Sequence, residues 1–324
     1  MDMSGYVVDL KDKKILRELD ADARQSCSTI AKKIGLSTEV VNYRIKKLEH
    51  EKIITQYQLI VNLSQLNILQ FKLCISFQHI TSNKLYEIIS EIKKMNAVKW
   101  IVSCKGNWDL LISLETNSLE NMDSLKEEVL SYFEGYINQK SISILVEAQT
   151  YDRNYLTSDK NILNRSRIIM KKSKSVNLDE LDIIILKKLS ENARKSIIDI
   201  ANELDSTPRI INYRIKQLRK NNIILGFKIA LNYSKLGIQF YKTFIYLDNA
   251  KKERLKSLIN YFEYNKNIIH HVKVLGSWDL EPEFEVYSEK EFDDIIIKIK
   301  NDFADIIKKI DIITISAEHK FVYF

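Results

Sequence analysis

A long internal repeat constrains this sequence more than any other feature. The stretch VVNYRIKKLEHEKII at residues 40–54 returns as IINYRIKQLRKNNII at residues 210–224, an offset of 170 positions. The same offset pairs Trp108 and Asp109 with Trp278 and Asp279. Such a repeat is a domain-sized unit rather than the period of roughly 20 to 50 residues that marks a solenoid. We therefore expect the 324-residue chain to hold two copies of a two-part module.

The composition is that of a soluble globular protein, with 45% hydrophobic and 29% charged residues. No apolar run approaches the ~20 residues of a membrane span. The opening MDMSGYVVDLKDKK lacks the basic region and apolar core of a signal peptide. These features predict a cytoplasmic protein with no membrane partner. The net charge of +7 favours an acidic partner, although many basic proteins share such a charge.

Cysteine and glycine usage argues against several classes of enzyme. Cys27, Cys74 and Cys104 are widely spaced and include no C-x-x-C pair, so neither a disulfide framework nor a zinc site is expected. The chain has only seven glycines and no glycine-rich phosphate-binding motif. We expect no metal, no cofactor and no common nucleotide-dependent activity.

Each copy opens with a pattern of three short helices. Apolar Leu10, Ile15, Leu16 and Leu19 share one face of the first helix, as do Leu181, Ile185, Leu186 and Leu189 in the second copy. Gly35 suits the left-handed position that ends the second helix, and Asp205 replaces it in the second copy. Ser37 and Thr207 are expected to cap the third helix, with Pro208 at its first position. The pattern predicts two helix-turn-helix units.

The third helix decides whether these units bind DNA. At 100° per residue, Val41, Ile45 and Leu48 face the other helices, and so do Ile211, Ile215 and Leu218. The other face carries residue types that suit a DNA groove, since Asn pairs with adenine, Arg with guanine, and Lys and Tyr with phosphate. The candidate DNA-binding residues are Glu39, Asn42, Tyr43, Lys46, Lys47 and His50 in the first copy, and Arg209, Asn212, Tyr213, Lys216 and Lys220 in the second.

Each of these side chains has a simpler explanation as part of a solvated helix face, and only the helix-turn-helix context favours DNA for the set. Arg44 and Arg214 lie toward the edge of the helical core. We expect them to form ion pairs with Asp12 and Asp182 of the first helix rather than to contact DNA.

The second part of each copy follows the order β-α-β-β-α-β, which predicts a ferredoxin-like sheet with two helices on one face. Strands such as LLISL are apolar on both faces, so the bare face of each sheet is expected to pack against the other copy as an internal pseudo-dimer. In the first copy the expected elements are 69–80, 82–95, 97–105, 108–115, 118–134 and 140–148.

With these elements in place, each repeat resembles the Lrp/AsnC (feast/famine) family of transcription regulators. The resemblance rests on the openings VDLKDKKIL and LDELDIIIL, the Ala-Arg pairs at 23–24 and 193–194, the RI-x-x-L helices, and the GNWD and GSWD hairpins. It implies an α+β chain of two winged-type helix-turn-helix domains alternating with two ferredoxin-like domains. It also implies a sequence-specific regulator that binds double-stranded DNA and is able to form homo-oligomers. The expected domains are 1–62, 63–150, 177–232 and 233–324, with a basic linker at 151–176.

The resemblance also implies an amino acid or other small effector near the two hairpin turns. The candidate effector-binding residues are Gly106, Trp108 and Asp109 in the first copy and Gly276, Trp278 and Asp279 in the second. A tight β-turn with a core anchor would need the same residue types without any ligand. In the second copy Pro282 suits an edge strand, and Glu281, Glu283 and Glu285 on one face suggest a wet surface or a basic partner, so that the second pocket is lost.

The connector at 151–176 has seven Lys or Arg against two Asp and no clear periodicity. We interpret it as a solvated tether, with a position near DNA phosphates as the alternative.

Two rival functions remain open at this stage. Sirohaem decarboxylases resemble this family in both domains, and a fused chain of that kind would need His and Arg to bind the tetrapyrrole carboxylates. The available histidines are His79, His270, His271 and His319. The other rival is a partner-binding scaffold with vestigial helix-turn-helix domains. The expectation is a regulator that is not an enzyme.

Overall fold

The structure is a computed structural model that describes residues 6–157, 165–171 and 176–322. The first helix-turn-helix unit consists of α1 (Leu10–Ala21), α2 (Cys27–Ile34) and α3 (Thr38–His50). The second consists of α6 (Glu180–Glu191), α7 (Ile197–Glu203) and α8 (Pro208–Lys220). None of the helices in the described ranges has the length and apolar character that crossing a bilayer requires.

The expected capping residues are confirmed. The side chains of Ser37 and Thr207 accept hydrogen bonds from the backbone of the first turn of α3 and α8, and Pro208 starts α8. Gly35 and Asp205 both adopt the left-handed conformation, with φ of +70° and +47°. The short Asp side chain tolerates this region better than most residues do, so both turns keep the same course.

The helical cores follow the expected periodicity, with one exception. Val41, Ile45 and Leu48 of α3 are buried against the other helices. Their counterparts Ile211, Ile215 and Leu218 are buried in the second unit. The expectation that Leu10 joins this core is wrong: it is 59% exposed at the first position of α1.

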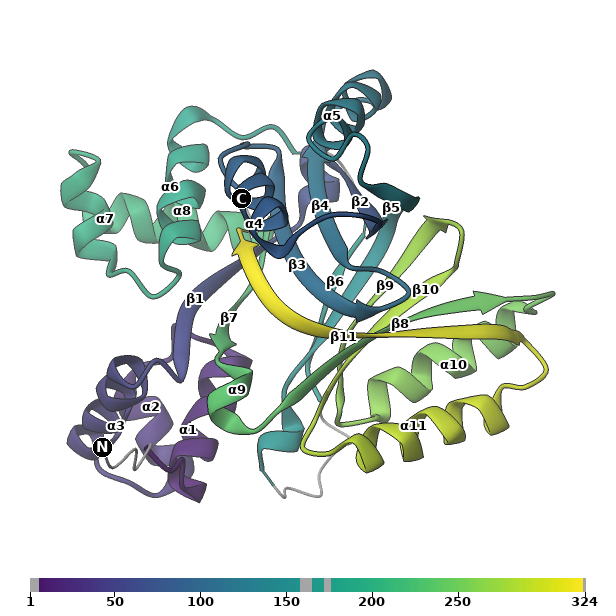
Figure 1. The fold of residues 1–324 in the computed structure, drawn as a ribbon. Coiled ribbons are helices and arrows are strands. Elements are labelled where there is room, and N and C mark those ends of the chain that lie inside the picture. Colours follow the sequence, from purple (N-terminus) through teal and green to yellow (C-terminus); the bar gives the residue numbers. More distant parts are fainter. Residues whose placement is uncertain (1–5, 158–164, 172–175, 323–324) are drawn as a thin grey trace.

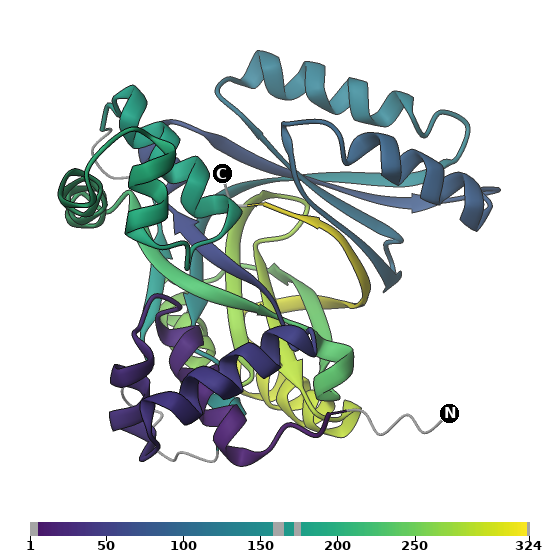
Figure 2. The same cartoon turned by 90° about the vertical axis from the view of Figure 1, so that its left-hand side faces the viewer.

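A two-stranded ribbon joins the two copies. Strand β1 (Ile54–Val61) pairs antiparallel with β7 (Ile224–Leu231) of the other copy. The ribbon runs between the two helix-turn-helix units, which lie on one side of the molecule (Figures 1 and 2). The first helix of each unit packs on the strand of the other copy, α1 on β7 and α6 on β1. Each helix-turn-helix unit therefore packs on a wing strand that the other copy supplies.

The expected β-α-β-β-α-β order is present in both copies. The first contains β2 (Leu69–Phe77), α4 (Ser82–Ile92), β3 (Val98–Gly106), β4 (Leu110–Thr116), α5 (Leu119–Ser131) and β5 (Ile137–Tyr151). The second contains β8 (Gln239–Leu247), α10 (Lys252–Tyr264), β9 (Ile268–Gly276), β10 (Leu280–Val286), α11 (Glu289–Asp302) and β11 (Ile307–Phe321). Short helices η1 (Leu63–Leu66) and α9 (Tyr233–Leu236) lead into β2 and β8.

The two sheets close into a ring of eight strands. Within the copies the orders are β5-β2-β4-β3 and β11-β8-β10-β9, and the pairs β3–β11 and β5–β9 join them at both edges. The last strand of each copy has 15 residues, which lets it pair with its own sheet first and with the other sheet further on. The bare faces are thus covered by each other, as expected, and helices α4, α5, α10 and α11 lie outside the ring (Figure 1).

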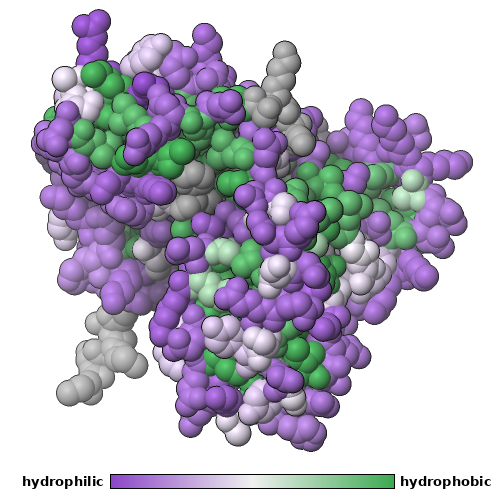
Figure 3. All heavy atoms as spheres, turned by 90° about the horizontal axis from the view of Figure 1, so that it is seen from above, coloured by the Kyte–Doolittle hydropathy of each residue, from purple (hydrophilic) through white to green (hydrophobic). Residues whose placement is uncertain are grey.

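Apolar residues gather in three cores. One lies under α4 and α5 and one under α10 and α11. The third continues from the helix-turn-helix units through the ribbon into the interior of the ring. On the face shown in Figure 3, hydrophilic residues surround separate hydrophobic patches.

Two expectations about loops and edges are wrong. The described part of the connector is not a solvated tether: Arg153 and Arg165 are buried, residues Asn154–Leu156 form the short helix η2, and β6 (Arg167–Met170) pairs with β5. Residues 158–164 and 172–175 of the connector lie outside the described range. Pro282 is not at an edge, because β10 lies between β8 and β9. The ladder to β8 passes from Leu280 to Glu283 without a pair at Pro282, so its missing N–H costs little.

Candidate functional site

The exposed faces of α3 and α8 form the candidate nucleic-acid interface. In α3, Glu39, Asn42, Tyr43 and Lys46 are exposed, as is His50 at its end. Hydrogen bonds from its own backbone N–H and from Ser37 lower the pKa of Glu39, so this position is anionic at neutral pH. Most of the expected set in the first copy is therefore accessible to a groove.

Lys47 differs from the rest of this set. Its side chain is half-buried, and its ammonium group lies 4.4 Å from the centre of the Tyr6 ring. A cation held over an aromatic face is less available to a phosphate. Lys47 thus serves to fix the segment before α1, a role that helical periodicity alone did not indicate.

The second helix presents a more basic face. Arg209, Tyr213, Lys216 and Lys220 are exposed, and Asn212 is half-buried. Tyr213 is 59% exposed and Tyr43 is 64% exposed. Both rings are therefore accessible, at matching positions in the two units.

Arg44 and Arg214 form the expected ion pairs. Arg44 Nη1 lies 2.8 Å from Asp9 and 2.7 Å from Asp12. Arg214 Nη1 lies 2.6 Å from Asp179, and the distance to Asp182 is 3.5 Å. These ion pairs join α3 to the N-terminus of α1 and α8 to the N-terminus of α6, so the two arginines stabilise their helix-turn-helix units.

The repeated Ala-Arg pairs link the two units reciprocally. Arg24 Nη1 donates to the carbonyls of Ala193 (2.6 Å) and Lys195 (2.9 Å). Arg194 Nη1 donates to the carbonyls of Ala23 (2.5 Å) and Gln25 (3.2 Å). The two units are thereby held in one fixed relation, which the sequence did not reveal because the partners are backbone atoms of the other copy.

The six candidate effector residues lie in two hairpin turns beside the strands that join the copies. Asp109 Oδ2 accepts a hydrogen bond from the Phe77 N–H, and Asp279 Oδ2 accepts one from the Leu247 N–H, both at 2.8 Å. Gly106 lies opposite Ile313 and Gly276 opposite Ser143, and a Cβ atom at either glycine would come within 2.6 Å of a backbone carbonyl oxygen. These contacts give the turns a structural role; an effector there stays a prediction.

The two tryptophans of the turns differ in one respect. Trp108 and Trp278 are both buried, with ring centres 6.2 Å apart across the interface of the copies. Trp278 Nε1 donates to Glu281 Oε1 at 2.9 Å. Leu111 occupies the position matching Glu281 in the first copy, and the Trp108 N–H finds no hydrogen-bond acceptor among the described residues.

The three carboxylates of β10 lie inside the ring, so the expectation of a wet surface is wrong. Glu281 lies between Lys72 and Lys242, which occupy matching positions in the two copies. Burial by itself raises the pKa of the Glu281 carboxyl, but Lys242 and Lys72 together bring it below its ordinary value. Glu283 bonds Lys242 at 2.8 Å. The basic partner expected for this face is therefore supplied by Lys72 and Lys242 of the same chain.

A second buried ion network ties the connector to the first helix-turn-helix unit. Arg153 forms ion pairs with Asp20 (2.6 Å) and with Glu285 (2.8 Å). Lys228 Nζ lies 3.1 Å from both Asp20 and Asp152. Asp20 is fully buried, and although burial raises its pKa, the two cations lower it below the usual range. The C-terminal end of α1 is thus held by charges.

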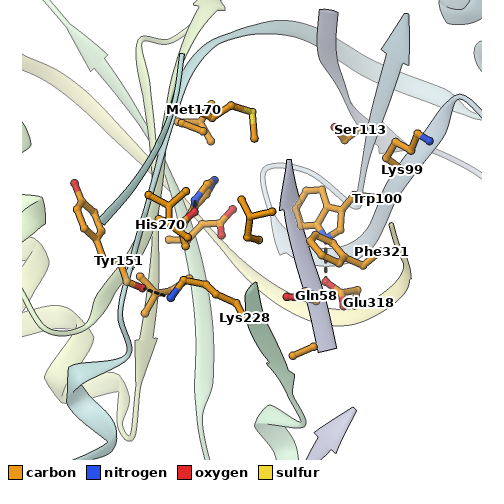
Figure 4. Close-up of a pocket in the computed structure, with 18 of the residues that line it drawn as sticks. Gln58, Lys99, Trp100, Ser113, Tyr151, Met170, Lys228, His270, Glu318 and Phe321 are labelled. Carbon is orange, nitrogen blue, oxygen red and sulfur yellow. Dashed lines mark hydrogen bonds between the residues drawn. The ribbon is translucent and has the colours of Figure 1, made fainter. Parts of the chain in front are cut away.

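A cavity of about 190 Å³ lies between the ribbon and the open end of the ring (Figure 4). Trp100, Phe321 and Glu318 stand together on one side, and Tyr151 lies on the opposite side. His270 faces the cavity from β9, and Lys72, Arg153 and Lys228 contribute to its wall. This site was not predicted from the sequence. Lys72 and Lys242, at matching positions in the otherwise apolar strands β2 and β8, could have indicated a polar interior.

The histidines do not form a shared site. His270 lines the cavity, whereas His271 points to the opposite face of the sheet, where it packs against Phe262. His319 bonds Ser103, and His79 lies in a turn with φ of +56°. Within the described ranges, no three His, Cys, Asp or Glu side chains are placed to hold a metal ion.

Comparisons with known proteins agree with the helix-turn-helix geometry. An AsnC-type helix-turn-helix domain matches residues 8–49. An HTH-type transcriptional regulator of Pyrococcus furiosus is 32% identical over 103 residues, which cover 32% of this chain and 68% of that protein. Another from the same organism, FL11, is 27% identical over 129 residues, or 39% of this chain and 82% of its own.

Two helix-turn-helix units with exposed recognition helices, together with these relatives, define a DNA-binding transcription regulator. The chain belongs to the Lrp/AsnC family. It carries two copies of the two-part module in tandem.

The fold is shared over nearly the whole length with a solved enzyme. The siroheme decarboxylase NirDL covers 97% of this chain and 93% of its own, with a TM-score of 0.60 and 14% sequence identity. At that identity the likeness concerns the fold, including its duplicated arrangement.

Proposed function

We propose that this chain binds duplex DNA as a single-chain pseudo-dimer, with α3 and α8 each entering a major groove. The observation that carries the proposal is the reciprocal Arg24 and Arg194 linkage, which fixes two exposed recognition helices on one side of the molecule. Helix-turn-helix dimers read two half-sites whose spacing follows from the separation of their recognition helices. A covalently joined pair meets that requirement without a second chain.

The roles of individual side chains follow from their chemistry. Asn42 and Asn212 are suited to adenine edges, and Arg209 to guanine or to phosphate. Lys46, Lys216 and Lys220 are suited to phosphates, and Tyr43 and Tyr213 to phosphate or sugar. Glu39 carries a negative charge at the first turn of α3, where it is able to accept from a cytosine amino group while repelling phosphate.

The test is selection of bound fragments from random duplex DNA, followed by titration of the selected sequence at several salt concentrations. We expect a two-part consensus and an affinity that falls steeply with salt, because bound lysines and arginines release counterions. Undetectable binding of both random and genomic duplexes at ~50 mM salt would refute the proposal.

An effector at the first hairpin turn belongs to this proposal. The buried Trp108 N–H supports it: this donor has no acceptor within the described part of the chain, and a buried donor left unpaired costs about 1–3 kcal/mol. In the second copy Glu281 satisfies the matching indole, so we expect no effector there. Calorimetry with a panel of amino acids is the test: one of them should bind the wild type and lose affinity in Trp108→Phe. Equal binding by the variant would contradict the assignment.

A second candidate function, decarboxylation of sirohaem, is favoured by the fold likeness to NirDL and by the position of His270 in the cavity. The charges argue against it. Every Lys and Arg of the described cavity wall is already paired: Lys72 with Glu281, Lys99 with Glu115, Arg153 with Glu285 and Lys228 with Asp20. Lys99 alone faces a carboxyl, Glu115, whose pKa burial raises to about 7, so little positive charge is left for the carboxylates of a tetrapyrrole. We therefore expect titration with sirohaem to give no stoichiometric absorption band; such a band would favour the enzyme.

A further inference from the structure

The cavity beneath the ribbon has walls from both copies and from the DNA-binding half. Gln58 and Ile60 of β1 and Ala230 of β7 face it. Alternate residues of the same strands, Tyr57 and Ile229, belong to the core that includes the helix-turn-helix units. The ribbon is thus a single layer between the cavity and the two units. Anything that fills the cavity touches the strands that carry them.

Most of the hydrogen-bond donors in the wall are already used. Lys228 donates to Asp20 and Asp152, and Arg153 to Asp20 and Glu285. Lys72 bonds Glu281. An ammonium or guanidinium group with its protons committed to carboxylates has little to offer an anionic ligand. The wall therefore does not suit a carboxylate or phosphate.

The acceptors, by contrast, are partly free. Glu318 at the cavity mouth accepts from the Trp100 Nε1–H at 2.9 Å, and it takes part in none of the ion pairs found among the described residues. Glu283 bonds Lys242 through Oε1 alone. Burial lowers the pKa of His270, so its ring is neutral at pH 7 and adds no positive charge. The free polar atoms of the cavity call for a donor-rich ligand.

The rest of the wall is apolar and aromatic. Trp100, Phe240 and Phe321 contribute rings, and Ile168, Met170 and Leu231 contribute aliphatic side chains. A few placed polar groups in an apolar concavity are typical of small-molecule sites, and aromatic faces attract cations.

We infer that this cavity is a regulatory site for a small amphipathic cation: an apolar or aromatic body with a protonated amine, which pairs with Glu318 beside Trp100. The regulatory part of this inference rests on the proposed DNA-binding function. The site is separate from the hairpin turns, since none of the six turn residues lines it.

The route from the cavity to the first helix-turn-helix unit is short. Lys228 and Arg153 line the cavity, and both hold Asp20 in the last turn of α1. Ser190 stands at the matching position of the second unit, so the second unit has no carboxylate there. Ligand contact with Lys228 or the ribbon therefore changes how α1 of the first unit is held.

The binding test uses phenethylamine and phenylacetate, which share a ring and differ in the sign of their charge. Calorimetry on the wild type should show one saturable site for phenethylamine, with phenylacetate at least about tenfold weaker. Glu318→Gln keeps an acceptor for Trp100 and removes the charge, and it should weaken phenethylamine binding about tenfold. Glu128→Gln, the same change on the exposed face of α5, should have no effect.

Three results would overturn the site: no saturable phenethylamine binding up to ~10 mM, equal or tighter binding of phenylacetate, or unchanged affinity in Glu318→Gln. Trp108→Phe should bind phenethylamine as the wild type does, which separates this site from the turns.

The regulatory arm measures DNA affinity with and without saturating phenethylamine. The wild type should change its affinity for the selected duplex by at least about threefold, a modest allosteric coupling. Asp20→Asn should bind the amine and lose that response. An equal response in Asp20→Asn, or none in the wild type, overturns the coupling. If the wild type binds no duplex, the proposed function fails while calorimetry still decides the site.

Discussion

At the scale of single residues, the two recognition helices differ most in charge. Residues 38–50 carry three basic and two acidic side chains, a net of +1, whereas residues 208–220 carry five basic and none acidic, a net of +5. Lys47 is further withdrawn by the Tyr6 ring. Since phosphate contacts supply much of the affinity for DNA, α8 is expected to dominate binding and α3 to contribute selectivity.

Two sets of substitutions separate these roles. Arg209→Ala with Lys216→Ala should weaken binding to all sequences and reduce the slope of log affinity against log salt by roughly 2. Glu39→Ala should change the selected consensus with little loss, or a gain, of affinity. Electrophoretic titration and repeated selection provide the measurements. If both variants weaken binding equally and keep the consensus, the two helices are equivalent.

Glu115 predicts a pH dependence of stability. Burial raises the pKa of this carboxyl to about 7, against the ion pair with Lys99. A folded-state pKa above the unfolded value means that unfolding releases a proton between these values. The contribution of Glu115 to the free energy of unfolding is therefore fully present below about pH 4.5. It falls by on the order of 3 kcal/mol as the pH rises to about 7.

Glu115→Gln should remove this loss, because an amide keeps the hydrogen bond from Gln70 without the charge. Denaturant unfolding of both proteins between pH 5 and 8 is the measurement. The variant should gain relative to the wild type as pH rises; a constant difference across this range would show that Glu115 is ionised throughout.

At the scale of elements, the ring depends on the close approach of β3 to β11 and of β9 to β5. A Cβ atom at Gly106 or Gly276 would lie 2.6 Å from the carbonyl oxygen of Ile312 or Ile142. Gly106→Ala and Gly276→Ala should each destabilise the protein by about 2–4 kcal/mol.

Gly135→Ala is the matched control. Gly135 has φ of +81° and open space where the Cβ atom of an alanine would lie. The loss of stability in this variant therefore comes from backbone strain alone and should be about 1 kcal/mol. Thermal or urea unfolding compares the three variants. If Gly106→Ala and Gly276→Ala lose no more stability than Gly135→Ala, the strand junctions accommodate a Cβ atom by a small backbone shift.

Local features of these elements were predictable from the sequence. Caps at Ser37 and Thr207, the left-handed Asp205 and the strand and helix order depend on neighbours in the chain, and the structure has them all. Pairings between copies were not predictable, because alternation fixes the faces of β1 but not its partner β7. The face of β10 was misjudged for the same reason: Lys72, which neutralises Glu281, lies 209 positions away.

At the scale of the whole molecule, the interior of the ring specifies the pairing of unlike halves. One copy supplies Lys72 and Leu111, and the other supplies Lys242 and Glu281. A pair of first copies would bury two lysines without Glu281, at a cost of about 3–5 kcal/mol for each charge left unpaired. A pair of second copies would gather an excess of carboxylates.

Expressing residues 1–157 and 165–324 as separate chains tests this specificity. Together they should co-purify as a 1:1 complex, and each alone should aggregate or stay unfolded, as size-exclusion chromatography with light scattering would show. Glu281→Leu in the second fragment should abolish the complex, whereas Glu289→Leu on the exposed face of α11 should not. A stable homodimer of either fragment would contradict the expectation.

The trio of Lys72, Glu281 and Lys242 also gives the molecule a direction. A dimer of identical chains reads the same sequence from either end and has no front or back on DNA. Here the halves cannot exchange places, and the more basic α8 always lies on the same side of the less basic α3. We expect the bound protein to point one way along the duplex, so that an operator inverted in front of a gene would present the opposite flank to the transcription machinery.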